Sequence, residues 1–224
     1  MLHLGGEITP AVYSRLETSI RKRDSERTVE VLIDSPGGDL ATAMKIGRLF
    51  RAGAPVTAIV APGAKCASAC VLALVGATTR VIGGSVAIHR PYTVDANHRA
   101  YGELQKQFAQ IDTQARVFLA EMNIPPSLYD EMLRYPPESI RVLSKEELDR
   151  FRISGTDYVW EETVQRRHAQ TLGIDRQTYV QRLGLAGRMC STPPGEGPGE
   201  GTEQWAARLV AANDCRHRIL KSGR

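Results

Sequence analysis

Ser68 is a candidate nucleophile. It lies in the stretch Lys-Cys-Ala-Ser-Ala-Cys at residues 65–70, among small side chains, where a strand-and-turn pattern gives way to a helical one. Such a context can present a hydroxyl on a sharp turn at a helix N-terminus, where free backbone N–H groups hold an oxyanion. Many serines at helix N-termini only cap the helix, so the local pattern is compatible with either role.

His89 is a candidate general base. It follows the strand-like residues 85–88 and precedes Arg-Pro, and a histidine at the carboxyl edge of a sheet is well placed to move protons. A purely structural histidine is the simpler interpretation. Ser-Pro-Gly-Gly at residues 35–38 follows a β-branched run and can aim backbone amides into a crevice, or only turn the chain.

The elements around these residues alternate between strand and helix. Periodicity, caps and turn residues predict strands at 28–34, 55–60, 80–82, 85–88 and 140–143, and helices at 9–24, 40–51, 67–76, 96–122 and 125–133. A capping box at 144–147 opens a last core helix. This alternation predicts an α/β fold with βαβ units and a largely parallel sheet.

The helix at 96–122 is too long to be covered by a domain of this size. Its apolar stripe contains Leu104, Phe108, Ile111, Ala115 and Phe118, so we expect it to protrude and pack on another part of the chain or on another subunit. We expect an α/β domain over residues 1–156 and a small helical extension over 157–224, with a Pro/Gly-rich linker at 191–201.

Three segments together resemble the Clp protease proteolytic subunit family in their order, their spacing and the β-α-β pattern around them. They are the turn at 35–38, Ser68 after a second strand, and Ile-His-Arg-Pro at 88–91. The resemblance covers about residues 2–152. It is closer still to a bacterial group of Clp-like proteins often predicted to be periplasmic, in which Cys-x-Ser-x-Cys (66–70) and Leu-Ser-x-Glu-Glu-Leu (143–148) recur.

The resemblance implies a ClpP/crotonase-like repeated βαβ spiral in which residues 96–122 form the handle through which subunits assemble. It implies a serine peptidase acting on peptides or unfolded protein, with Ser68 as nucleophile and His89 as its base. The amides of Gly38 and Ala69 would form the oxyanion hole. It implies a homo-oligomer and no cofactor, and leaves an ATPase partner undetermined.

The sequence departs from the family at the third catalytic residue. Aligning the family's segment after the catalytic Asp on residues 142–144 puts Ile140 at the Asp position, and isoleucine cannot orient an imidazole. Ser139 and Glu138 are the nearest polar alternatives, and Asp95 is a third. Loss of a triad Asp costs about 10⁴ in rate, so a Ser-His dyad, a different third residue and a poor catalyst all stay open.

Lys65 and Lys106 are alternative bases, because relatives of this fold that cleave signal peptides use a Ser-Lys dyad. Lys65 precedes Ser68 by only three residues and Lys106 lies on the expected handle, so we prefer His89.

The four cysteines match neither a zinc ribbon nor a Cys-x-x-Cys redox motif. We expect Cys66 and Cys70 to pack as small hydrophobic residues; a disulfide on the nucleophile turn requires that Cys66 precede the helix. A Cys190–Cys215 disulfide fits an exported protein.

Composition argues against several other classes of function. The 224 residues are 42% hydrophobic and 24% charged with a net charge of +4, and the basic residues are scattered, which argues against nucleic-acid binding. No apolar run reaches the length of a membrane span, and no cluster of ligands suggests a metal. The chain begins as a strand with no signal peptide, so cytoplasmic and periplasmic localisation both stay open.

Two other functions stay open. The first is a Clp-like assembly or binding protein without activity, which the missing Asp suggests. The second is a crotonase-type acyl-CoA enzyme, although the sequence offers no Glu base at the expected elements.

Overall fold

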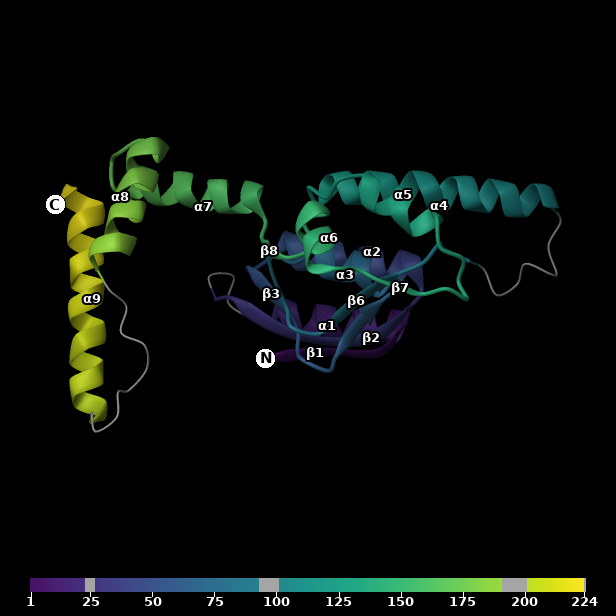
Figure 1. Cartoon of the computed structure of the whole chain (residues 1–224), viewed down its shortest axis with the longest axis horizontal. Helices are drawn as coiled ribbons and strands as arrows, with labels where there is room; N and C mark the ends of the chain where they lie inside the picture. Colours follow the sequence, from purple (N-terminus) through teal and green to yellow (C-terminus); the bar gives the residue numbers. More distant parts are fainter. Residues whose placement is uncertain (23–26, 93–100, 191–200, 224) are drawn as a thin grey trace. The chain divides into compact units, whose positions relative to one another are not determined.

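The computed structural model describes residues 1–22, 27–92, 101–190 and 201–223, which form two compact units, Met1–Asp157 and Tyr158–Arg224 (Figure 1). The elements of the first unit are β1 (Leu2–Ile8), α1 (Pro10–Arg21), β2 (Val29–Gly38), α2 (Leu40–Ala52), β3 (Val56–Val60), β4 (Lys65–Ala67), α3 (Cys70–Val75), β5 (Thr79–Ile82), β6 (Ser85–Ile88), α4 (Tyr101–Glu121), α5 (Ser127–Leu133), β7 (Arg141–Val142), α6 (Lys145–Arg150) and β8 (Gly155–Thr156). Those of the second unit are α7 (Tyr158–Thr171), α8 (Arg176–Met189) and α9 (Thr202–Ser222).

The sheet of the first unit is built around β2. Within the described ranges the strand order is β7-β6-β4-β2-β3-β5-β8, and β1 pairs with β2 as well. The short pairings of β5 with β8 and of β6 with β7 are antiparallel, and the other pairings are parallel. The chain visits both halves of the sheet in turn, through β3 and β4 and then β5 and β6. The predicted α/β class with a largely parallel sheet is therefore confirmed.

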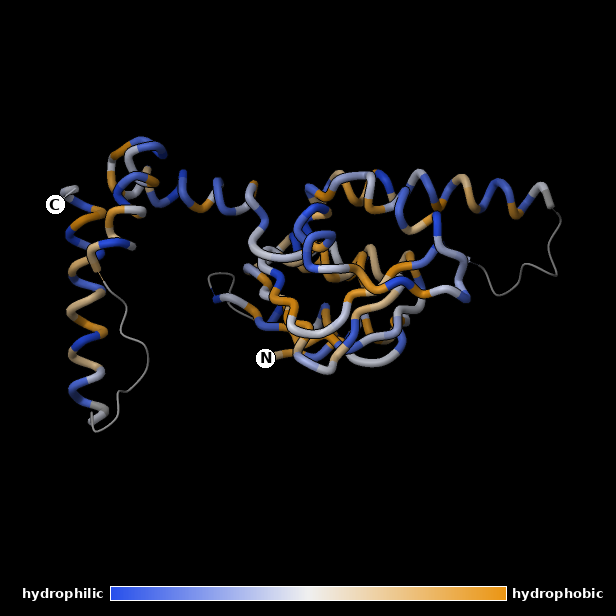
Figure 2. Tube along the Cα trace, viewed as in Figure 1, coloured by the Kyte–Doolittle hydropathy of each residue, from blue (hydrophilic) through white to orange (hydrophobic). Residues whose placement is uncertain are grey.

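The core follows from the alternation of side chains along the strands. In β2 and β3 every second side chain is buried, as expected for strands in a sheet. All six residues of α3 are buried, and Figure 2 shows hydrophobic positions gathered on the strands and the adjoining helices of this unit. α1 begins as predicted, with the Oγ1 of Thr9 accepting a hydrogen bond from the amide of Val12 and Pro10 in the first turn.

Two local predictions were wrong. Residues 35–38 do not form a free turn but complete β2, because β1 runs alongside as far as the Ile8–Gly38 pair. The helix predicted at 67–76 begins only at Cys70, because residues 65–67 form β4 between β2 and β6. In both places pairing with a distant strand overrides the local preference.

The long helix α4 has two different halves. In its second half Ala115, Phe118 and Leu119 are fully buried, whereas Phe108 in the first half is exposed. Figure 1 shows the first turns of α4 running beyond the sheet of its unit. Residues 96–100 of the predicted handle lie outside the described residues.

A capping box secures α6 beside β7. The Oγ of Ser144 accepts a hydrogen bond from the Glu147 amide, and the Glu147 carboxylate accepts one from the Ser144 amide (2.9 Å). Arg141 of β7 donates to the same carboxylate at 2.7 Å. That hydrogen bond is the main reason why the pKa of Glu147 is lowered, with the Ser144 amide as the second cause.

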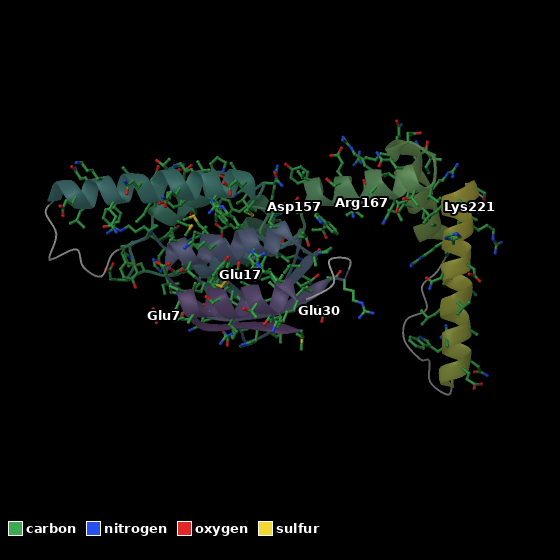
Figure 3. All side chains as sticks on the ribbon, turned by 180° about the vertical axis from the view of Figure 1, so that it is seen from behind. Glu7, Glu17, Glu30, Asp157, Arg167 and Lys221 are labelled. Carbon is green, nitrogen blue, oxygen red and sulfur yellow. A yellow bond between two sulfur atoms is a disulfide. The ribbon has the colours of Figure 1, made fainter. Side chains whose placement is uncertain are left out.

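A buried ionic cluster closes the first unit at Asp157, which Figure 3 labels. The Asp157 carboxylate is 2% exposed and lies 3.1 Å from Nη1 of Arg51. Arg51 and Arg80 both donate to the carbonyl of Val75, at 3.3 and 3.0 Å. Burial lowers the pKa of Arg80 to about 10, against an opposing effect of the Asp157 charge. Removing Asp157 would therefore leave cationic groups buried without their carboxylate.

The described residues of the second unit form three helices, α7, α8 and α9. α8 and α9 are joined by the Cys190–Cys215 disulfide, with Cα atoms 5.8 Å apart, and by Arg182, which donates to the carbonyls of Leu220 and Lys221. The linker predicted at 191–201 lies, except for Gly201, outside the described residues. Across the described ranges no helix has the length and hydropathy needed to cross a membrane.

Candidate active site

Ser68 occupies a sharp turn between β4 and α3. Its φ is +57°, a left-handed conformation that is uncommon for a residue with a side chain. Its amide donates to the carbonyl of Ala87 (2.9 Å), and its carbonyl accepts from the amide of Val71 (3.1 Å). The residue is partly exposed although its neighbours on both sides are buried. The turn therefore keeps the hydroxyl accessible while its backbone is bonded to β6 and α3.

The two glycines that end β2 allow this strand to approach Ser68. A Cβ on Gly37, whose φ is +105°, would lie 2.8 Å from the Cβ of Ser68 and 3.1 Å from the amide nitrogen of Ala69. A Cβ on Gly38, whose φ is +141°, would lie 2.5 Å from the carbonyl oxygen of Ile8. Neither position tolerates a side chain without displacement of backbone.

The amides near Ser68 differ in whether they are already bonded. The amide of Gly37 donates to the Oγ of Ser35 (3.1 Å), and the amide of Asp39 donates to the carbonyl of Ile8 (2.9 Å). Since successive N–H groups of a strand alternate in direction, the Gly38 amide is expected to point away from β1. In the described part of the chain, the Ala69 amide has no hydrogen-bond partner.

His89 is held in one tautomer by the backbone. The side chain lies just beyond β6, is 6% exposed, and its Nδ1 is 2.8 Å from the carbonyl oxygen of Arg90. A carbonyl can only accept, so Nδ1 must carry the proton that forms this bond. In the neutral imidazole the lone pair is then on Nε2, as a general base for serine requires.

Ser68 and His89 follow neighbouring parallel strands. The β4–β6 register pairs Ala67 with Ala87, so both side chains emerge at the carboxyl ends of these strands. Between these two described residues the structure has no hydrogen bond, and in unliganded sites such contacts are often long.

Those predicted third residues that the structure describes make no hydrogen bond to His89. The β6–β7 pairing ends at the Ile88–Arg141 pair, and Ile140, the residue just before β7, is 56% exposed. Glu138 and Ser139 are exposed and make no hydrogen bond to the imidazole. Asp95 lies outside the described residues. The partner of Nδ1 is the Arg90 carbonyl, which sequence reasoning missed because a backbone acceptor has no residue-type signal.

The two alternative lysines are exposed. Lys65 begins β4, and its amide donates to the Oδ1 of Asp34 (3.1 Å). Lys106 lies on α4. In the described ranges neither side chain makes a hydrogen bond to Ser68.

Cys66 and Cys70 are buried in the core, as expected for small hydrophobic residues, but the alternative that was left open also holds. They form a disulfide with Cα atoms 5.3 Å apart. The geometry is available because Cys66 belongs to β4 and only Cys70 to α3. The cross-link therefore encloses Ser68.

A groove of about 920 Å³ begins one residue beyond His89. Its apolar walls come from the segment after β6 and from α4 and α5, namely Pro91, Tyr92, Phe108, Ala109, Tyr129 and Leu133. Arg90, Asp112 and Glu138 add charges of both signs. Burial raises the pKa of Tyr129 to about 12, so its hydroxyl stays protonated near neutral pH.

Comparison with known proteins identifies the family. No curated protein matches the chain. Among solved structures, a mutant of the 1510-N membrane-bound stomatin-specific protease is similar, with a TM-score of 0.52, 19% identity, and 74% of this chain and 83% of that chain covered. That likeness supports the ClpP/crotonase-like fold. The family model for Clp protease matches residues 2–128, more than half of the sequence, and the chain therefore belongs to the Clp protease family.

Proposed function

We propose that this protein is a serine peptidase that hydrolyses peptides or unfolded protein through an acyl-enzyme. The observation that carries the proposal is the fixed tautomer of His89, which leaves Nε2 as the basic nitrogen at the strand end beside Ser68. Membership of the Clp protease family supports the same class of reaction.

In the proposed mechanism, Nε2 of His89 removes the proton from Ser68 as Oγ attacks the peptide carbonyl. The amides of Gly38 and Ala69 stabilise the oxyanion, and the lack of a partner for the Ala69 amide among the described residues favours this role. His89 then protonates the leaving amine. Water, activated by the same imidazole, hydrolyses the acyl-enzyme and restores Ser68.

The carbonyl of Arg90 would replace the missing Asp in part. It can hold the tautomer and the ring orientation, which a triad carboxylate also does. As a neutral group it stabilises the imidazolium less than a carboxylate would. We therefore propose a Ser-His dyad of modest rate, without a catalytic role for Ser139 or Glu138.

The groove beyond His89 would receive the substrate. Its apolar walls suit one bulky hydrophobic side chain of an extended peptide, while Arg90 and Glu138 offer polar contacts. We further propose that the exposed half of α4 mediates homo-oligomer formation and that residues 158–224 act as a separate helical extension.

Cleavage of fluorescently labelled unfolded casein tests the proposal. Ser68→Ala and His89→Ala should abolish cleavage, whereas Ser139→Ala, an exposed serine close to the site, should leave it unchanged. If the folded wild type binds casein without cleaving it, an assembly or binding role would replace the peptidase. The observation that favours that second function is Ile140, an exposed isoleucine at the position where the family has its catalytic Asp. Binding of an acyl-CoA without cleavage would point instead to crotonase-type chemistry.

A further inference from the structure

The disulfide between Cys66 and Cys70 encloses the proposed nucleophile and no other reactive side chain. The enclosed residues are Ala67, Ser68 and Ala69. Both cysteines are 0% exposed. The cross-link therefore lies inside the protein and acts on the turn that carries Ser68.

The two ends of this cross-link are anchored in different elements. Cys66 pairs with Ser35 of β2 on one side and with Val86 of β6 on the other, so it is fixed in the sheet. Cys70 is the first residue of α3, a helix whose cap residue makes no side-chain hydrogen bond. The disulfide therefore ties the start of the helix to the sheet. No capping side chain secures this end of the helix.

The backbone between these anchors is in an unfavourable conformation. A left-handed φ at a residue with a side chain persists only where the surrounding structure holds it. Hydrogen bonds to Ala87 and from Val71 hold Ser68 in part. The disulfide adds a constraint over five residues and also fixes the neighbouring Ala69 amide.

Ser68 has little room to move relative to the end of β2. Gly37 approaches so closely that a Cβ added to it would lie 2.8 Å from the Ser68 Cβ. A small relaxation of the turn would therefore change the distance from Oγ to the glycine strand and to His89. A shift of about 1 Å at a reacting group can cost about 10²-fold in rate.

We propose that the Cys66–Cys70 disulfide is a positioning device that holds Ser68 and the Ala69 amide in reactive geometry, so that the oxidised protein is the active form. This inference rests on the proposed function, in which Ser68 is the nucleophile. The cysteines do not touch the substrate; they act through the backbone between them.

The test is the rate at which a fluorophosphonate probe labels Ser68, measured over a range of probe concentrations. Cys66→Ala/Cys70→Ala should lower the limiting rate kinact about tenfold, which corresponds to about 1.4 kcal/mol, with KI for the probe within about twofold of wild type. The matched control is Cys190→Ala/Cys215→Ala, which removes the disulfide of the second unit and should leave kinact unchanged.

Reduction of the wild type covers the case in which the first variant does not fold. A phosphine reductant supplies two electrons and, with water, the two protons, and is itself oxidised to its phosphine oxide. Alkylation verifies that the thiols are free. Labelling should slow about tenfold and recover after reoxidation with oxidised glutathione.

Equal kinact in the wild type and in Cys66→Ala/Cys70→Ala, or in oxidised and reduced protein, would overturn the inference and leave the peptidase proposal intact. A wild type that is folded and oxidised but unlabelled would instead overturn the proposed function itself.

Discussion

A carboxylate at position 140 should increase the rate at which Ser68 reacts if the Arg90 carbonyl acts only as a neutral replacement for the triad Asp. The perturbation is Ile140→Asp. The side chain of Ile140 is 56% exposed, so the change should cost little stability. The β6–β7 pairing ends at Ile88–Arg141, and these two residues adjoin His89 and position 140 along the chain. We therefore expect the new carboxylate to come within reach of the imidazole of His89.

The size of the effect follows from the charge and the exposure. Two unit charges about 4 Å apart interact by about 4 kcal/mol at an effective dielectric constant of about 20. Solvent at this half-exposed position should reduce that to about 1–2 kcal/mol. Since about 1.4 kcal/mol is tenfold in rate, we expect a gain of about 5–30-fold. This is below the full 10⁴ of a triad Asp because the tautomer is already fixed.

The assay is kinact for fluorophosphonate labelling, or kcat for a chromogenic peptide, at neutral pH. Ile140→Asn is the matched control, because it has the shape of Asp without its charge and should change the rate less than about twofold. An unchanged or lower rate in folded Ile140→Asp would refute the reasoning. It would mean that position 140 does not face His89 or that the imidazolium needs no counter-charge.

Three further predictions concern packing and charge. Gly37→Ala should slow labelling of Ser68 at least about tenfold because the added Cβ collides with the turn that carries Ser68. The control is Gly63→Ala: Gly63 has a φ of +85°, but an added Cβ there meets no other atom, so the change should lower stability without slowing labelling. Labelling rates and thermal unfolding distinguish the two effects. Asp157→Ala should destabilise the first unit by about 3–5 kcal/mol because it leaves the buried Arg80 and the half-buried Arg51 without the nearby carboxylate. Glu121→Ala, which breaks an exposed ion pair, should cost at most about 1 kcal/mol. Equal losses in urea unfolding would contradict this. Glu147→Gln should cost about 1 kcal/mol at pH 7. Because the folded pKa of Glu147 is lowered, its contribution is complete above the unfolded pKa and is lost as the pH falls through the folded value; the two unfolding curves should therefore converge in acid.

The parts of the site that depend on residue type and strand order could be predicted from the sequence. His89 was expected at the end of the strand at 85–88, and it lies just beyond β6. Ser68 was expected near a helix start after the strand at 55–60; it does precede α3, but the strand before it, β4, was not predicted. The resemblance carried by the glycines, the serine and the histidine led to the family that the comparison identifies.

The parts that depend on tertiary contacts could not be predicted. The Ser-Pro-Gly-Gly stretch has the composition of a turn, and only pairing with β1 makes it strand. The Arg90 carbonyl has the same chemistry at every residue, so no sequence pattern marks it as the partner of His89. Whether Cys66 and Cys70 can form a disulfide depends on where the helix starts, and the ends of elements are the least certain feature of a sequence pattern.

Mapping the covalent adduct of a fluorophosphonate probe by mass spectrometry tests the central claim most directly. The account predicts one adduct, on Ser68, that is lost in Ser68→Ala and in His89→Ala but retained in Ser139→Ala. Absence of any adduct on the folded, oxidised wild type, or an adduct that persists in His89→Ala, would contradict a serine activated by His89.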